Sequence, residues 1–367
     1  MDFELFRELI LISIGEKDSF SSVPTGEDWL QSFKIAKKQA LLGVCFGGIQ
    51  RLYQERPEQL VSLPADLKTR WTGTAVIIQC RNELMNARCV ELQQRLSDSG
   101  LKSCILKGQG VASFYGPLAS FRQSGDIDVF VDADRVTALD YLKNNGIVCY
   151  GWDYVHAHPH FFDDVEVELH YRASVFRNLV RNRKFQRFVE HNKSEFFGGS
   201  VELADAGSIV VPSGWINLFY QLHHIYRHLF SEGIGLRQVM DYYFSLKVIL
   251  LSDEDKKKLL KAVKEFGMKR FARGLMWILA DVFNMNKDLM LWESDEKEGR
   301  FILSGILKGG NFGKGNNRHS KYFNRRVNKY AEAIHRSFHL VAHYPSEALW
   351  TPIYYLWHFC WKRLQSI

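Results

Sequence analysis

The 367-residue chain has 46% hydrophobic and 24% charged side chains, a composition typical of a globular protein, and ~100–200 residues per domain predicts two or three structural units. Its net charge of +7 is local, because seven of the 48 Lys and Arg residues lie within 308–329 and the other 41 equal the 41 Asp and Glu residues. The apolar runs are shorter than the ~20 residues of a membrane-spanning helix, and we find no signal peptide. The six cysteines include no C-x-x-C pair, which argues against a zinc ribbon and a disulfide framework and favours a reducing, cytoplasmic environment.

Residues 1–98 are expected to form an N-terminal helical region. Apolar residues recur there at spacings of three and four, through Phe3–Ile14, Trp29–Leu52 and Trp71–Leu96. The third helix is expected to end before Gly100, since glycine suits the position just after a helix.

Between residues 99 and 175 short strands alternate with turns and helices, which predicts a small mixed sheet with helices packed on it. The expected strands are Lys102–Leu106, Ile127–Val131, Ile147–Tyr150 and Val165–Tyr171, with a helix at Asp134–Asn145. A turn, Lys107-Gly108-Gln109-Gly110, follows the first strand, and Gly116-Pro117 interrupts the helical start after it.

From Phe176 onwards the helical pattern returns, and we assign a helical domain at 176–304 followed by a basic, glycine-rich connector and an aromatic helical tail at 305–367. The expected helices are Ile216–Phe230, Leu236–Leu251, Asp253–Phe266, Lys269–Phe283 and a basic one near Asn324–Tyr344, after a polar stretch at Gly305–Asn317. The basic residues 308–329 are either a solvated connector or a contact for a polyanion. The tail is either a packed helix or an interfacial one.

The most informative feature is a pair of aspartates, Asp126 and Asp128, in an apolar run that continues to Val131. Side chains alternate between the two faces of a strand, so both carboxylates point the same way and Ile127 and Val129 point into a core. Two adjacent negative charges are costly to bury unless they are paired or bound to a metal. Mg²⁺ prefers such hard oxygen ligands, so the pair predicts a magnesium site.

The neighbouring residues supply the other requirements of phosphoryl or nucleotidyl transfer. The turn at Lys107-Gly108 can cradle phosphates, and Arg122 can make bidentate contacts to them. Glu168, on a later strand with the same alternation, is the expected third carboxylate, with Glu166 as its rival. Three carboxylates around two metal ions would stabilise the attacking and the leaving oxygen of an in-line displacement.

These motifs together resemble the polymerase-beta-type nucleotidyltransferase superfamily, and within it the bacterial branch called the uncharacterised nucleotidyltransferase family. The residues that carry the resemblance are Leu106-Lys107-Gly108, Tyr115-Gly116-Pro117, Arg122, Gly125-Asp126-Ile127-Asp128-Val129, Val167-Glu168-Leu169-His170 and Leu236-Arg237 with Asp241. The resemblance implies an α+β fold, in which a nucleotidyltransferase core lies between N-terminal and C-terminal helical regions. It also implies Mg²⁺-dependent transfer of a nucleoside monophosphate from an NTP to a hydroxyl of an unknown acceptor, with release of pyrophosphate.

The resemblance also implies roles for the matching residues. Asp126 and Asp128 would hold two Mg²⁺ ions, and Glu168 would complete one site and help to deprotonate the acceptor. The expected phosphate-binding residues are Lys107, Gly108, Gln109, Arg122, Arg237 and His170. The alternative for His170 is that it orients the Glu168 carboxylate, and the alternative for Arg237 is a surface ion pair with Asp241, four residues later.

Two histidine groups stand apart from these motifs. His156, His158 and His160 alternate like a strand and either chelate a transition metal or belong to a hairpin that lines the active cleft. His224 and His228 are four residues apart on a helix, which places them on one face, where packed or hydrogen-bonded rings are expected.

Two other functions fit the same residues. An inactivated relative would still bind a nucleotide or a partner, and Gln109 in the turn favours it. A metal-dependent phosphohydrolase would use the same carboxylates with water as the nucleophile. For a transferase, the acceptor could be a small molecule, a sugar, or the end of a protein or an RNA.

Overall fold

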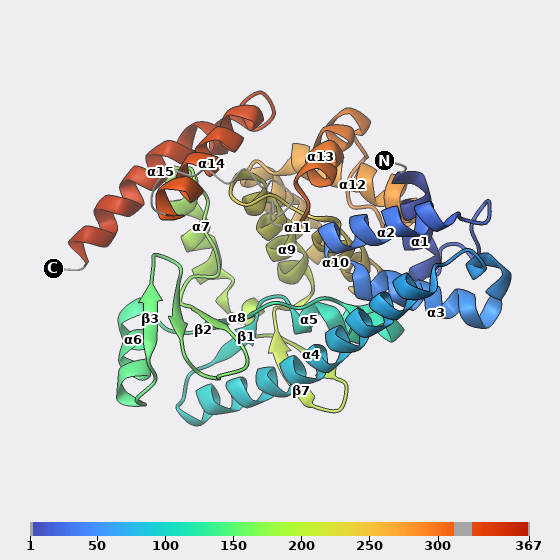
Figure 1. The fold of residues 1–367 in the computed structure, drawn as a ribbon. Helices are drawn as coiled ribbons and strands as arrows, with labels where there is room; N and C mark the ends of the chain where they lie inside the picture. Colours follow the sequence, from blue (N-terminus) through green and yellow to red (C-terminus); the bar gives the residue numbers. More distant parts are fainter. Residues whose placement is uncertain (1–2, 312–324, 366–367) are drawn as a thin grey trace.

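In the computed structural model, which describes residues 3–311 and 325–365, a small sheet lies at one side and helices form the rest of the molecule (Figure 1). The N-terminal helices and the last two helices, within residues 325–365, lie on opposite sides of a central helical layer (Figure 1). This arrangement confirms the predicted α+β fold class, a small mixed sheet flanked by helical regions.

The sheet has the strand order β1-β2-β5-β4-β3. β2 and β5 pair in parallel, and the other three pairs are antiparallel. The strands are β1 (Ser103–Ile105), β2 (Ile127–Val131), β3 (Cys149–Trp152), β4 (His156–Pro159) and β5 (Val167–His170). The chain passes from β2 to β5 through α6 (Arg135–Asn144) and the β3–β4 hairpin, as a parallel pair requires a crossover connection.

Helices precede, interrupt and follow the sheet. Before it come α1 (Phe3–Ser13), α2 (Gly26–Gln39), α3 (Leu42–Glu55), a 3-10 turn (Pro57–Leu60) and α4 (Ala65–Asp98). Between β1 and β2 lie α5 (Gln109–Ala112) and a 3-10 segment (Ser113–Phe121). After it come α7 (Leu179–His191), α8 (Lys193–Phe196), α9 (Gly214–Phe230), α10 (Leu236–Val248), α11 (Asp253–Glu265), α12 (Lys269–Phe283), a 3-10 turn (Lys287–Leu289), α13 (Glu296–Gly309), α14 (Arg325–Leu340) and α15 (Pro345–Leu364).

Strand β2 is buried on both faces, and its two faces meet different parts of the molecule. Ile127, Val129 and Val131 join an apolar cluster with residues of α4 and α6. Phe130 points the other way and packs in the larger helical core, so Asp128, two residues before it, lies on the side of the helices. Alternation along one strand therefore separates the apolar core from the carboxylate.

Helix α9 is the central element of the helical layer. Fifteen of its seventeen residues are buried, as expected for a helix that is apolar on most of its circumference. The polar side chains that it does carry, among them His224 and Arg227, are therefore held inside the molecule or at a cavity wall.

Two elements differ from the sequence-based expectation. A hairpin, β6 (Gly199–Leu203) with β7 (Gly207–Val211), lies in a region predicted as helical, and its Leu203, Ile209 and Val211 complete the apolar cluster beside α4. Helix α13 extends to Gly309, into the stretch predicted to be an irregular connector. Residues 312–324 of the basic segment 308–329 lie outside the described residues, with three of its seven basic side chains, and so does the predicted polyanion contact.

The C-terminal helix α15 packs against the β3–β4 hairpin through aromatic side chains. Trp361 lies edge-on to Trp152 and Tyr154, with ring centroids 5.9 and 5.3 Å apart. Tyr354 is buried with Val155 in a small apolar cluster. One face of the predicted aromatic tail is thus packed. Across the described ranges, 3–311 and 325–365, helices that combine the length and the apolarity needed to cross a bilayer do not occur.

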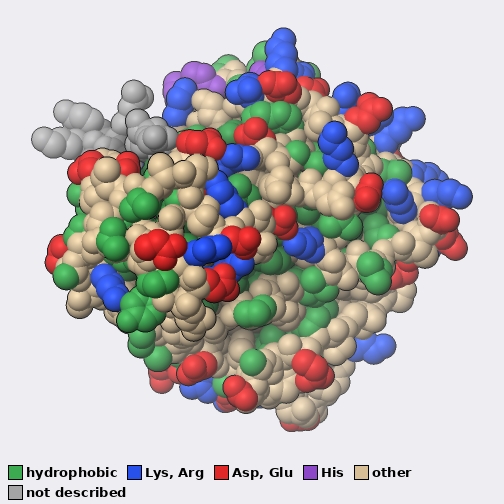
Figure 2. Space-filling model, turned by 90° about the vertical axis from the view of Figure 1, so that its right-hand side faces the viewer, with side chains coloured by type: hydrophobic (Ala, Val, Ile, Leu, Met, Phe, Trp, Pro, Cys, Tyr) green, Lys and Arg blue, Asp and Glu red, His purple; other side chains and the backbone are tan. Residues whose placement is uncertain are grey.

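The surface shows the balanced charge of the chain outside its basic segment. On the face in Figure 2, basic and acidic side chains are interspersed and apolar ones are scattered among them.

Close helix packing beside the site provides a test of the fold. A methyl group at Gly43, in α3, would lie 2.1 Å from the carbonyl oxygen of Phe121, so Gly43→Ala should lower the free energy of unfolding by about 1–3 kcal/mol. Gly73, in the exposed part of α4, has no atom within 4 Å of such a methyl group, and Gly73→Ala should raise stability by up to ~1 kcal/mol. Urea denaturation measures both, and equal effects of the two substitutions would contradict the packing described here.

Candidate active site

The parallel pairing of β2 with β5 places two of the predicted carboxylates side by side. Asp128 is directly opposite Glu168 in the register of the two strands. Asp128 is 3% exposed and Glu168 is half-buried, whereas Glu166, the rival third ligand, is exposed. Asp126, just before β2, lines the same cavity as the other carboxylates. The structure thus brings Asp126, Asp128 and Glu168 to one place and leaves Glu166 at its rim.

Two cations stand among these carboxylates. Nζ of Lys107 lies 3.0 Å from Oδ2 of Asp128. Nε2 of His170 lies 3.1 Å from Oδ1 of Asp128 and 3.3 Å from Oε2 of Glu168, so His170 bridges the two strands. Asp128, Glu168 and His170 form one group of possible metal ligands here, with their ligand atoms within 4.8 Å of one another. Of the two roles considered for His170, the geometry corresponds to orientation of the carboxylates.

The charges of this cluster shift the pKa values in opposite directions. The negative charge of Asp128, with burial, raises the pKa of Asp126 to about 6. Burial alone would raise the pKa of Asp128, but Lys107 and a hydrogen bond with His170 outweigh it and lower that pKa. Burial opposes the charge of His170, yet its contacts with Asp128 and Glu168 raise its pKa to about 9. Asp126 is therefore the carboxylate whose charge is least compensated.

This charge balance bears on whether the site fits Mg²⁺. Three carboxylates face two fixed cations. Oδ2 of Asp128 is buried with no hydrogen-bond partner among the described residues, and it forms an ion pair with Lys107. Carboxylate oxygens are the ligands that Mg²⁺ prefers. The donor set of Asp126, Asp128 and Glu168 therefore fits a hard divalent cation.

The predicted turn lies at the edge of the same cavity, but only part of it faces inward. Lys107 and Gly108 line the cavity, and Gly108 has φ +64°, a conformation that favours glycine. The side chain of Gln109 is 2% exposed and hydrogen-bonds to Asn86 and Ser124. This buried network turns the side chain of Gln109 away from the cavity, and phosphate binding by this residue of the turn stays a prediction.

Arg122, another predicted phosphate contact, lines the same cavity. Its guanidinium is 3% exposed and forms a bidentate ion pair with Asp241 of α10, at 2.7 and 2.8 Å. The hydroxyl of Tyr115 donates to the same carboxylate at 2.6 Å. Helix α10 thus brings Asp241 onto Arg122, which ties the segment before β2 to the helical layer. The alternative of an exposed Arg237–Asp241 pair is wrong, since Asp241 is largely buried beside Arg122.

Basic side chains from the helices face the carboxylates across the cavity. Arg237 lines it and donates from Nη1 to the carbonyl of Gln123 at 2.6 Å. His224 and Arg227 of α9 also line it, and Nζ of Lys107 lies 3.5 Å from Nε2 of His224. Arg177 lies against the rings of Tyr354 and Tyr355, 4.7 and 4.6 Å from their centroids. The cavity therefore has carboxylates on the sheet and three arginines on the helices and the segment after β5, where Glu232 and Asp241 also line it.

Sequence analysis missed Arg177 and Arg227 as site residues. Arg227 has a local signal, because it lies three residues after His224 on the same helix face, and Nε of Arg227 is buried without a hydrogen-bond partner among the described residues. Arg177 has none, since it follows a strand in an irregular segment and meets its aromatic partners only through α15. His156 and His158 line the cavity, whereas the exposed ring of His160 pairs with Asp163 at 2.9 Å.

The cavity has a volume of about 910 Å³ and lies between the sheet, α9, α10 and α15. It is lined by the carboxylates and by the basic and aromatic side chains described above. A cavity of this size is at the upper end of the range for small-molecule sites and has room for a nucleotide together with part of an acceptor.

Comparisons with known proteins identify the family of the chain. The sequence profile of the uncharacterised nucleotidyltransferase family matches residues 25–284, more than half of the chain, so the chain belongs to this family. Among solved structures, an antigenic nucleotidyltransferase-like protein from Paracoccidioides brasiliensis is similar, with 12% identity, a TM-score of 0.34 and coverage of 59% of this chain and 96% of that one. The search of curated proteins finds no match. Family membership supports a general nucleotidyltransferase function.

The raised pKa of Asp126 predicts a pH-dependent loss of stability. A carboxyl whose pKa is higher in the folded than in the unfolded protein destabilises the fold as pH rises from about 4 to about 6. Asp126→Asn removes this effect and should make the metal-free protein up to about 3 kcal/mol more stable than wild type at pH 7, with little difference at pH 4. Urea unfolding in EDTA at several pH values measures the difference, and Asp140→Asn, an exposed carboxylate on α6, is the control. A constant difference across this range would refute the charge balance.

The Arg122–Asp241 pair predicts a large effect on folding. Asp241→Asn leaves the Arg122 charge buried without its partner and should lower the free energy of unfolding by about 3–5 kcal/mol. The control is Glu254→Gln, which breaks an exposed i,i+4 pair with Lys258 and should change stability by less than ~0.5 kcal/mol. Denaturant titration compares the two, and similar effects would show that Arg122 is not anchored by Asp241.

Proposed function

We propose that this chain transfers a nucleoside monophosphate from an NTP to a hydroxyl group of an acceptor and releases pyrophosphate. The observation that carries the proposal is the register of Asp128 with Glu168 in a cavity that these three arginines also line. An NTP suits such a cavity. Its negatively charged triphosphate can contact the basic side chains, and the carboxylates can hold the metal ion that the phosphates also bind.

The ligands for Mg²⁺ in this proposal are Asp126, Asp128 and Glu168. When bound there, Mg²⁺ neutralises negative charge on the phosphates and stabilises the charge that develops on the attacking and leaving oxygens. Lys107, Arg227 and Arg237 are placed to hold the triphosphate. Arg122 keeps the segment before β2 in position through Asp241.

The reaction exchanges one bond at the α-phosphorus. The acceptor oxygen forms a bond to the α-phosphorus, and the bond from that phosphorus to the α,β-bridging oxygen breaks. Pyrophosphate leaves with the electron pair, and the hydroxyl proton passes to a carboxylate of the site or to solvent. His170 holds Asp128 and Glu168 in orientation, and it also lowers the pKa of Glu168 against the effect of burial, which keeps that carboxylate ionised.

The other two functions share this site, and the buried Gln109 side chain no longer favours an inactivated relative. Backbone groups and Lys107 form the cavity side of the turn, so an unusual side chain at 109 leaves that surface unchanged. A reducing, cytoplasmic location is also part of the proposal, supported by six free cysteines.

Substitution of the carboxylates tests the function. With Mg²⁺ and labelled NTPs, Asp128→Asn and Glu168→Gln should lower the rate of label transfer and pyrophosphate release by about a hundredfold or more, because each removes a ligand of the proposed metal site. Glu166→Gln is the matched control, since this glutamate is two residues away on the same strand segment but exposed.

Product analysis separates the alternatives in the same experiment. Label on an acceptor from cell extract supports transfer, free nucleotide without a labelled acceptor supports hydrolysis, and tight NTP binding without turnover supports a binding module. Turnover at the wild-type rate in the Asp128→Asn variant would show that the reaction does not depend on the carboxylates as proposed.

A further inference from the structure

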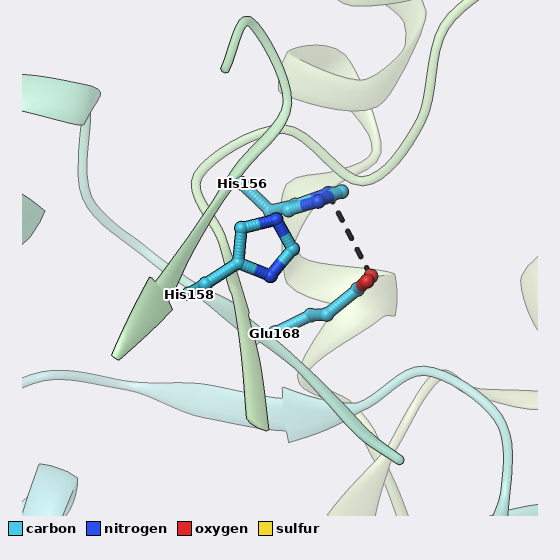
Figure 3. Close-up of side chains that lie close together, drawn as sticks. All are labelled: His156, His158 and Glu168. Carbon is cyan, nitrogen blue, oxygen red and sulfur yellow. Dashed lines mark ion pairs between the residues drawn. The ribbon is translucent and has the colours of Figure 1, made fainter. Parts of the chain in front are cut away.

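Strand β4 carries two histidines that neither the family match nor the proposed transfer reaction uses. His156 and His158 are separated by the fully buried Ala157, so both rings emerge on the same face of the strand. Figure 3 shows the two rings and the Glu168 carboxylate gathered on one side of β4 and β5. Ligand atoms of these three residues all lie within 4.8 Å of one another.

The His156 ring lacks a partner on the side that faces this group. Its Nδ1 is buried and has no hydrogen-bond partner within the described part of the chain. Oε2 of Glu168 lies 3.7 Å from this nitrogen, which is too long for a hydrogen bond. A buried nitrogen without a hydrogen bond is uncommon and calls for a ligand between it and the carboxylate.

A second carboxylate, that of Asp153, lies near the His156 ring. Oδ2 of Asp153 lies 3.9 Å from Nε2, the other ring nitrogen of His156, an ion-pair distance and not a hydrogen bond. Asp153 is itself fixed, because its Oδ1 accepts hydrogen bonds from the backbone N–H groups of Val155 and His156 at 2.7 and 3.1 Å. Histidines that bind metals are commonly oriented by such a carboxylate at the other ring nitrogen.

We propose that His156, His158 and Glu168 form a binding site for Zn²⁺, with its open coordination positions directed to the cavity. Two imidazoles and a carboxylate suit Zn²⁺, while Mg²⁺ takes oxygen ligands and discriminates against imidazole. The proposal rests on the proposed function in one respect, because Glu168 would be shared between this imidazole site and the carboxylate site. The protein would then combine a hard-ion site at Asp126 and Asp128 with a softer one beside it.

Metal binding to the full-length, metal-free protein tests the proposal without any nucleotide. Calorimetry should show one tightly bound Zn²⁺ per chain, and Co²⁺ should give a visible absorption spectrum with nitrogen ligands. His158→Ala should weaken Zn²⁺ binding at least about tenfold and remove the Co²⁺ spectrum. Because His158 is exposed, this variant should melt at the wild-type temperature, and His158→Gln replaces it if it does not.

His160→Ala is the matched control, because this histidine is two residues further on, exposed and paired with Asp163. It should bind Zn²⁺ as wild type does. The proposal would be overturned if the His158 variant kept its Zn²⁺ affinity or if the His160 variant lost as much affinity as the His158 variant. It would also be overturned if the wild-type protein bound Mg²⁺ as tightly as Zn²⁺.

Asp126→Asn keeps this test separate from the proposed function. It should retain Zn²⁺ binding at the histidines while losing Mg²⁺-dependent nucleotide turnover. Absence of turnover in the wild-type protein would count against the transfer reaction only, since Zn²⁺ binding is measured directly.

Discussion

Negative charge concentrated at the junction of two parallel strands is the constraint on which the rest of the site depends. The pairing of β2 with β5 sets Asp128 opposite Glu168, and the alternation of β2 directs its apolar residues to one core and Asp128 to the other side. Burial makes this charge unfavourable unless cations accompany it. Lys107 and His170 compensate it in part, and the raised pKa of Asp126 shows that a deficit of positive charge remains. Fixed charges that do not balance in this way favour the binding of a cation.

The helical layer completes the site and holds it in place. Arg122 and Asp241 form a buried bidentate pair, which fixes the segment before β2 against α10. The same helix carries Arg237, and α9 carries Arg227, so the anchoring of α10 also positions basic side chains opposite the carboxylates. An arginine and an aspartate of the motifs thus pair with each other here, while Arg227 and Arg237 line the cavity from helix faces.

The proposed reaction and the proposed Zn²⁺ site meet at Glu168. The register of β2 and β5 places its carboxylate beside Asp128, and the pairing of β4 with β5 places it near His156. His170 also contacts this carboxylate and orients it. One glutamate between an oxygen-rich and an imidazole-rich group allows two ions of different chemistry to be held side by side. The packing of α15 on the β3–β4 hairpin closes this side of the cavity and keeps Arg177 between two tyrosines.

Residue spacing and local motifs were sufficient to predict the α+β class, the family resemblance, the carboxylate strands and most of the helices. Strand alternation and helical spacing can be read from residues close together in the sequence. These patterns were not sufficient for the β6–β7 hairpin, whose strands are only five residues long, or for the helical end of α13. They also could not reveal the side-chain partners of Gln109 and Arg122, since Asn86 and Asp241 lie 23 and 119 residues away and become neighbours only on folding. The sequence by itself determined which side chains could bind metal and phosphate. Tertiary structure decided which of them face the cavity, because burial and long-range pairing are set by packing between elements.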